Sequence, residues 1–187
     1  MKKTKIDWAD STWNPVTGCL HGCEYCYAKA IANRFGWHAN EPDINERILH
    51  EIPVFDGKKQ PYPFDFAPTF HQYRLGEPAA WTKPRTIFVC SMADLFGDWV
   101  PDEWIKRVFE ACEAAPKHRY LFLTKNPARY IELAEKDILP DGADNMWFGS
   151  TATTPETEFF FSGGHNTFLS IEPILKPFHD SLDAGVQ

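Results

Sequence analysis

The 187-residue sequence lacks an apolar run of the roughly 20 residues that a membrane-spanning helix requires. It also lacks an apolar leader near the N-terminus, where segment 6–10 contains Asp7 and Asp10. The five cysteines are odd in number, which excludes a complete set of disulfides within the chain. We therefore expect a protein of the reducing cytoplasm without membrane contact, whose thiols are free or bound to a metal centre.

Positive charge is scarce as well. The sequence has 19 lysines and arginines against 26 acidic residues, and this net charge of −7 argues against a general basic surface for nucleic acid. A nucleic-acid partner would need a local basic cleft. No internal repeat or low-complexity segment interrupts the chain, so we expect one globular domain over residues 1–187.

Short apolar segments alternate with segments of helical periodicity. Helices are expected from Pro101, with Trp104 to Cys112 on the apolar side, and from Asn126 as N-cap and Pro127 as first residue to about Lys136. The expected strands are 12–16, 85–90, 120–123, 146–149 and 167–171. This alternation predicts an α/β fold with a parallel sheet, and the continuous apolar strands indicate burial on both faces.

Two segments are less regular. Residues 37–84 carry seven prolines interleaved with aromatic residues, and we expect an irregular insertion that packs over the sheet or its mouth. Between the last two strands, residues 156–161 have room for about two helical turns, which is short for a parallel crossover.

Three cysteines form the pattern C-x3-C-x2-C at Cys19, Cys23 and Cys26. Three thiolates on one loop can bind three irons of a [4Fe–4S] cluster and leave the fourth iron open to a small molecule. Gly18 and Gly22 allow the loop to curl around such a cluster. The pattern therefore favours an iron–sulfur cluster.

Zinc is the alternative ligand of this loop. His21 could complete a Cys3His site, although the chain has no second C-x2-C or H-x3-H knuckle. A helix expected from about Glu24 to a stop at Gly36 would point its free amides toward the loop and favour negative charge in either case. We expect Cys90 and Cys112 to be buried small hydrophobes instead of ligands.

Polar residues follow the predicted strands where each strand ends. In parallel α/β sheets ligands bind at the carboxyl ends of the strands. We therefore expect these residues to meet at one edge with the cysteine loop, and they are Asp94, Lys125, Ser150, Thr151 and Glu172.

The cysteine spacing, with the aromatic Tyr25 directly before the last cysteine, resembles the signature of the radical S-adenosylmethionine (SAM) enzymes. The resemblance implies a partial (β/α) barrel, here truncated after about the fifth strand because the chain stops at Gln187. It also implies a [4Fe–4S] cluster and SAM as cofactors. In such enzymes an electron from an external donor passes through the cluster and cleaves SAM to a 5′-deoxyadenosyl radical.

The same resemblance implies roles for residues at the strand ends. The loop after the second strand meets the amino group of SAM, the end of the fourth strand touches the ribose, and the region after the fifth strand lies near adenine or ribose. The family's Gly-Gly-Glu pattern is absent from the second strand of this chain. The expected cofactor-binding residues are Tyr25, Ser91, Met92, Asp94, Lys125, Ser150, Thr151 and Glu172.

Sequence blocks spread over residues 5–175 also resemble a phage- and prophage-associated family labelled as a domain of unknown function. The blocks are 5–8, 11–19, 91–96, 123–127 and 169–173. They imply family membership and no particular substrate. Three functions stay open at this point: a radical SAM enzyme with an unknown substrate, a non-enzymatic zinc- or cluster-binding module that organises a protein partner, and a nucleic-acid-modifying enzyme.

Overall fold

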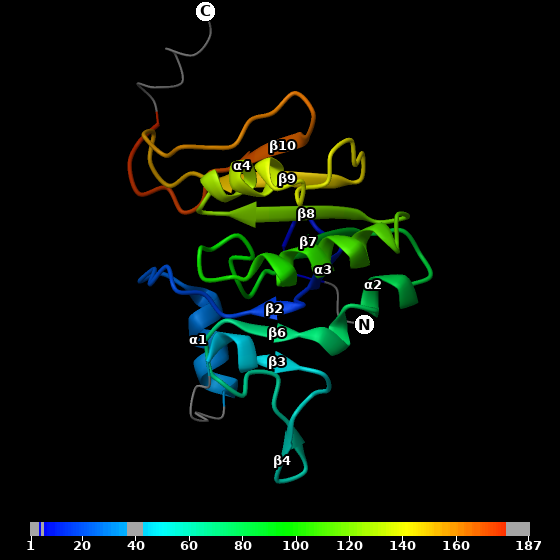
Figure 1. Ribbon diagram of the computed structural model, residues 1–187. Helices are drawn as coiled ribbons and strands as arrows, with labels where there is room; N and C mark the ends of the chain where they lie inside the picture. The colour runs from blue at the N-terminus through cyan, green and yellow to red at the C-terminus, as the bar shows by residue number, and fades with distance from the viewer. Residues whose placement is uncertain (1–3, 5, 37–42, 179–187) are drawn as a thin grey trace, which may run out of the picture.

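A computed structural model of the protein describes residues 4, 6–36 and 43–178. Its centre is an open sheet of five parallel strands in the order β1-β7-β8-β9-β10 (Figure 1). The strands are β1 (Ser11–Trp13), β7 (Thr86–Val89), β8 (Arg119–Thr124), β9 (Met146–Thr151) and β10 (Asn166–Ser170). The predicted α/β class with a parallel sheet is confirmed.

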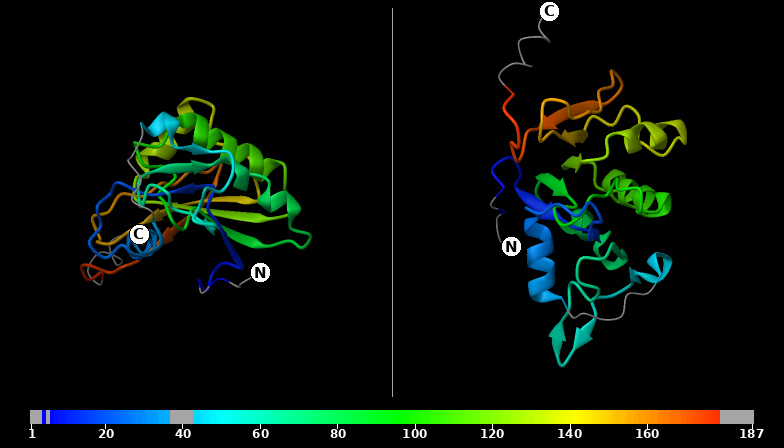
Figure 2. Two further views of the ribbon diagram at one scale, coloured as in Figure 1. Left: turned by 90° about the horizontal axis from the view of Figure 1, so that it is seen from below. Right: turned by 90° about the vertical axis from the view of Figure 1, so that its left-hand side faces the viewer.

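Two helices, α3 (Asp102–Glu113) and α4 (Ala128–Glu135), cover one face of this sheet (Figures 1 and 2). Each of the helical positions expected to be apolar in α3 is buried: Trp104, Ile105, Val108, Phe109 and Cys112. None of the helices in the described part of the chain has the length and apolar character that crossing a membrane demands.

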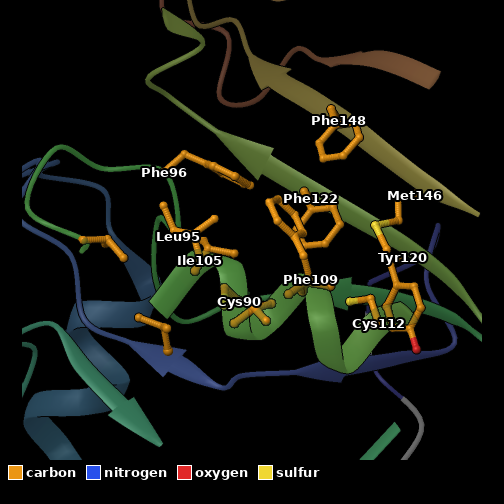
Figure 3. Packing of buried hydrophobic residues seen from close by; sticks show 14 of the residues in the cluster. Cys90, Leu95, Phe96, Ile105, Phe109, Cys112, Tyr120, Phe122, Met146 and Phe148 are labelled. Carbon is orange, nitrogen blue, oxygen red and sulfur yellow. The ribbon is translucent and has the colours of Figure 1, made fainter. Parts of the chain in front are cut away.

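Aromatic rings form the core between these helices and the sheet (Figure 3). Phe122 of β8 and Phe148 of β9 stack with ring centroids 5.5 Å apart. Phe109 of α3 meets Phe122 edge-on at 5.3 Å. These rings are almost completely buried. The face of the sheet under α3 and α4, which we call the outer face, therefore carries the main hydrophobic core.

The opposite, inner face is only partly covered, so the prediction of burial on both faces is wrong for β8 and β10. Along β8, buried residues alternate with half-buried ones, because α3 and α4 cover one face only. On the inner face, the Trp8 ring lies 4.7 Å from the Phe88 ring of β7 and 6.4 Å from the Phe168 ring of β10. In a flat sheet, with neighbouring strands about 4.8 Å apart, β7 and β10 would be too far apart for one ring to contact both, because two strands lie between them. Since Trp8 contacts both, the inner face is concave.

The predicted strand 12–16 is divided into two. β1 ends at Trp13, and β2 (Val16–Thr17) joins a second sheet with β6 (Thr69–His71) and β3 (Ile48–Leu49). Pro15 separates the two pieces, since proline has no N–H to donate to a strand ladder. Its carbonyl accepts a hydrogen bond from the amide of His71 instead. The chain therefore changes sheets just before the cysteine loop.

The predicted insertion at 37–84 is more ordered than expected where the structure describes it, and its residues 37–42 lie outside the described part. Phe70 of β6 stacks on Trp104 of α3 at 5.4 Å, which fixes the insertion against the main core. Besides β3 and β6, it contains η1 (Ile44–Glu46), β4 (Val54–Phe55), β5 (Lys58–Lys59), η2 (Gln72–Arg74) and α2 (Glu77–Ala80).

The helical turns predicted for 156–161 are wrong, because this crossover has no helix. The amide of Phe160 donates a hydrogen bond to Ser150 Oγ at 2.9 Å, and its ring lies 5.0 Å from that of Tyr130. These contacts hold the segment extended on the sheet. At α4, Asn126 is not the N-cap, because its side-chain amide donates to the Phe96 carbonyl and to Asp98, and the helix begins at Ala128.

Replacing a phenylalanine by alanine should lower the free energy of unfolding more on the outer face of the sheet than on the inner face. Phe122→Ala should lower the free energy of unfolding by about 3–5 kcal/mol, because it empties a fully buried ring position. Phe168→Ala removes the same atoms from a half-buried position and should cost about 1–2 kcal/mol. Urea unfolding of both variants measures the difference, and equal losses would contradict the assignment of the core to the outer face.

Candidate functional site

The carboxyl ends of the parallel strands surround one cavity of about 730 Å³. The cysteine loop that follows β2, the loops after β7, β8 and β10, and the end of β9 all contribute to its wall. The sequence-predicted residues that line the cavity are Cys19, Cys23, Tyr25, Cys26, Ser91, Asp94, Lys125, Thr151 and Glu172. Residues that are far apart in the chain thus come together as the parallel-sheet prediction required.

Two predicted residues, Met92 and Ser150, are not among those lining the cavity. Met92 is buried in a small cluster with Ala28 and Ala32, and its amide donates to Asn14 Oδ1 at 2.9 Å. Ser150 is fully buried, and alternation along β9 turns its side chain away from the face of Thr151. Their assignment as SAM ligands stays a prediction that rests on the family resemblance.

Backbone hydrogen bonds anchor the start of the cysteine loop. The Gly18 amide donates to the Met92 carbonyl at 2.9 Å, and the Cys19 amide donates to the Phe66 carbonyl at 3.1 Å. The first bond attaches the cysteine loop to the loop after β7, and the second attaches it to the insertion. Gly18 has a φ of 90°, a conformation that favours glycine.

Cys26 is the N-cap of helix α1 (Tyr27–Phe35), so the helix begins later than the predicted start near Glu24. The Lys29 amide donates a hydrogen bond to Cys26 Sγ at 3.4 Å. The free amides and the positive dipole end of α1 therefore lie beside this sulfur and favour a thiolate or another negative group there. The predicted stop at Gly36 is confirmed as the C-cap.

The cysteines are of two kinds: Cys90 and Cys112 are buried, whereas Cys19, Cys23 and Cys26 are half-buried. Burial raises the pKa of Cys90 to about 12 and that of Cys112 well above its ordinary value, as expected for small core residues. Burial also raises the pKa of Cys19 to about 11, although this residue lines the cavity. Cys19 is thus a neutral thiol near pH 7, and a coordinated metal would displace its proton.

Asp94 connects the cysteine loop to the strand ends. His21 Nε2 lies 2.7 Å from Asp94 Oδ2, and the carboxylate also accepts from the Lys125 amide at 2.9 Å. Sequence reasoning considered His21 only as a zinc ligand. The contact with Asp94 spans 73 residues, and no local pattern indicates it.

Lys125 brings charge to the cavity next to the cysteines. Its ammonium lies 3.1 Å from Tyr25 Oη and 5.1 Å from the centre of the Tyr25 ring, so the contact combines a hydrogen bond with a cation–π interaction. Among the cavity-lining residues that the structure describes, Lys125 is the one lysine or arginine, whereas Asp7, Asp94 and Glu172 are acidic.

Other lining residues were missed from the sequence. Trp8 and Phe88 form an apolar wall, and Phe66 adds a contribution from the insertion. Asn14 fixes the loop after β7, since its Oδ1 accepts from Ser91 Oγ at 3.1 Å as well as from the Met92 amide. Only the polar strand-end pattern was visible in the sequence, because the apolar wall looks like ordinary core.

The cysteines do not converge on one point. Among the residues that the structure describes, no three histidine, cysteine, aspartate or glutamate side chains come close enough to hold a single metal ion. Zinc requires such convergence, because each sulfur lies about 2.3 Å from the ion. A four-iron cluster binds each thiolate through a different iron, so its three sulfurs gather around the cluster and not around one ion.

The fold and the cavity define an α/β protein with a cysteine-lined cavity at the carboxyl edge of an open parallel sheet. A family model described as "Protein of unknown function (DUF5131)" matches residues 3–184, and the chain belongs to this family. No curated protein and no solved structure matches the chain. The predicted membership of a family of unknown function is thereby confirmed.

The anchored start of the loop can be tested with two glycines. A Cβ on Gly18 would lie 2.3 Å from the Ala67 carbonyl oxygen, whereas a Cβ on Gly22 would meet no atom within 4 Å. Both residues have positive φ, so Gly22→Ala should cost about 1 kcal/mol of stability through backbone strain alone. Gly18→Ala should cost about 3 kcal/mol or more, because backbone must also move. Urea unfolding that gave equal losses would contradict this account.

Proposed function

We propose that the protein is a radical SAM enzyme, in which Cys19, Cys23 and Cys26 hold a [4Fe–4S] cluster and SAM binds in the adjacent cavity. The observation that carries the proposal is that the three cysteines line the same cavity as the polar residues at the ends of β7–β10. A volume of about 730 Å³ lies within the usual range of small-molecule sites.

The donor set supports a cluster over zinc. Cys19, Cys23 and Cys26 are free and half-buried, so their sulfurs are accessible from the cavity while the loop backbone stays anchored. The C-x3-C-x2-C spacing supplies three thiolates for three irons and leaves the fourth iron open, whereas the sequence has no second C-x2-C or H-x3-H pair of the kind that zinc sites use. The concave open sheet fits part of a (β/α) barrel of the radical SAM type.

When bound and reduced by an external donor, the cluster supplies one electron that cleaves the sulfonium of SAM into methionine and a 5′-deoxyadenosyl radical, which takes a hydrogen atom from a substrate. The chain's own residues would bind, orient and shield. Trp8, Phe88 and Leu123 give the cavity an apolar wall that excludes water from the reacting groups. The excess of carboxylates over cations in the lining suits SAM, whose sulfonium is positive.

Lys125 is the residue best placed to bind the carboxylate of SAM. An ammonium has three donors, and the Tyr25 hydroxyl takes one of them. Lys125→Met should weaken SAM binding about tenfold, because a hydrogen bond to a charged group is lost. Lys29→Met, on the exposed side of α1, is the matched control and should bind SAM like the original protein. Calorimetry on anaerobic protein gives both affinities, and equal values would remove Lys125 from the site.

Metal content tests the central proposal. Anaerobic reconstitution should give a brown protein with about four irons and four sulfides per chain, and Cys→Ser changes at positions 19, 23 and 26 should each reduce this content strongly. Cys90→Ala removes a buried thiol away from the cavity and should keep the cluster.

Reaction products complete this test. The iron-loaded protein with SAM and a strong reductant should release 5′-deoxyadenosine and methionine, which chromatography with mass detection measures. Fully loaded protein that yields no 5′-deoxyadenosine would overturn the enzymatic proposal. Colourless protein with stoichiometric zinc would replace it with a structural metal module.

A further inference from the structure

The carboxylate of Asp94 is buried and already has a complete set of hydrogen-bond donors. Its Oδ1 accepts from the Phe96 amide at 3.0 Å and from Thr124 Oγ1 at 2.7 Å. Its Oδ2 accepts from His21 Nε2 at 2.7 Å and from the Lys125 amide at 2.9 Å. A carboxylate has about four lone-pair positions, so a further ligand would have to displace one of these donors.

The four donors come from three separate segments. Phe96 belongs to the loop after β7, and His21 lies in the cysteine loop. Thr124 is the last residue of β8, and Lys125 follows it directly. The side chain of Asp94 is only 8% exposed. A buried carboxylate without donors is expensive, so each of these segments is held to the others through one group.

His21 carries this connection to the cysteine loop. Because a carboxylate only accepts hydrogen bonds, His21 Nε2 must be the donor to Asp94. The imidazole also packs edge-to-face with Trp99, with ring centroids 4.9 Å apart. With the side chain held on both sides, the backbone of His21 is fixed as well, and His21 lies in the loop between the first two cysteines, Cys19 and Cys23.

We propose that Asp94 is a positioning residue, which through His21 holds the cysteine loop in place, and that Asp94 does not bind SAM. The positioning part concerns the protein without metal. The second part rests on the proposed function: the groups that orient the ligands of a metal site tune its metal affinity and its reduction potential. Loss of the His21–Asp94 contact should therefore change that potential and speed the loss of iron.

Hydrogen exchange of the metal-free protein tests the positioning role. His21→Ala and Asp94→Asn should each raise the exchange rate of amides 19–26 about tenfold, as expected when a local closed state is lost. Amides of α3 report whether the fold persists and should stay unchanged. Asp98→Asn changes an exposed carboxylate in the same loop after β7 and is the matched control. If Asp94→Asn also raises the exchange rates of α3, the fold of that variant does not persist, and the result for His21→Ala alone tests the positioning role.

A double variant sharpens this test. If Asp94 and His21 act through one contact, the combined variant should exchange no faster in residues 19–26 than Asp94→Asn alone. Additive increases, or no increase for His21→Ala while α3 stays protected, would overturn the positioning role. This result does not depend on whether the protein binds iron.

The loaded protein tests the second part. Redox titration followed by electron paramagnetic resonance should give a changed potential for His21→Ala, with an unchanged dissociation constant for SAM. A changed SAM affinity at unchanged potential would instead make Asp94 and His21 part of the binding site and overturn this part. Original protein that takes up no iron would defeat the proposed function, and the exchange result on metal-free protein would still stand.

Discussion

Parallel strands that lie side by side place all of their carboxyl ends on the same edge of a sheet. This constraint determines where reactive and ligand-binding side chains can gather, because every loop that follows a strand must start at that edge. In this protein β7 to β10 follow one another both in the chain and in the sheet. The residues just after them therefore face the cysteine loop without any long-range signal in the sequence.

The two faces of the sheet are used differently. The outer face is filled by stacked rings under α3 and α4, which provide most of the burial. The inner face curves around the cavity, and Trp8 bridges β7 and β10 across it. A concave face that is half covered costs stability but leaves room for a ligand between rigid walls, which is the arrangement that a bound cofactor needs.

Much of this could be predicted because it depends on local patterns. The strands and α3 follow from apolar runs and helical spacing, and the polar strand ends follow from strand direction. The break at Pro15 and the extended crossover could not be predicted in the same way. In the crossover, the bond from Phe160 to Ser150 replaces a helix, and such a bond is visible only after β9 and the crossover have packed. The roles of Trp8 and His21 also depend on partners distant in the chain.

Asp94 and Lys125 belong to the same sequence pattern but differ in how many of their hydrogen-bonding positions already have a partner. Asp94 and Lys125 both follow strands and both line the cavity. The carboxylate of Asp94 has a donor at each of its acceptor positions, so its hydrogen bonds join the surrounding loops and leave no acceptor position for a ligand. The ammonium of Lys125 bonds to Tyr25 and keeps donors for a ligand. A polar residue at a strand end is thus a binding group only where its neighbours leave it unsatisfied, and this depends on side-chain geometry that no spacing rule contains.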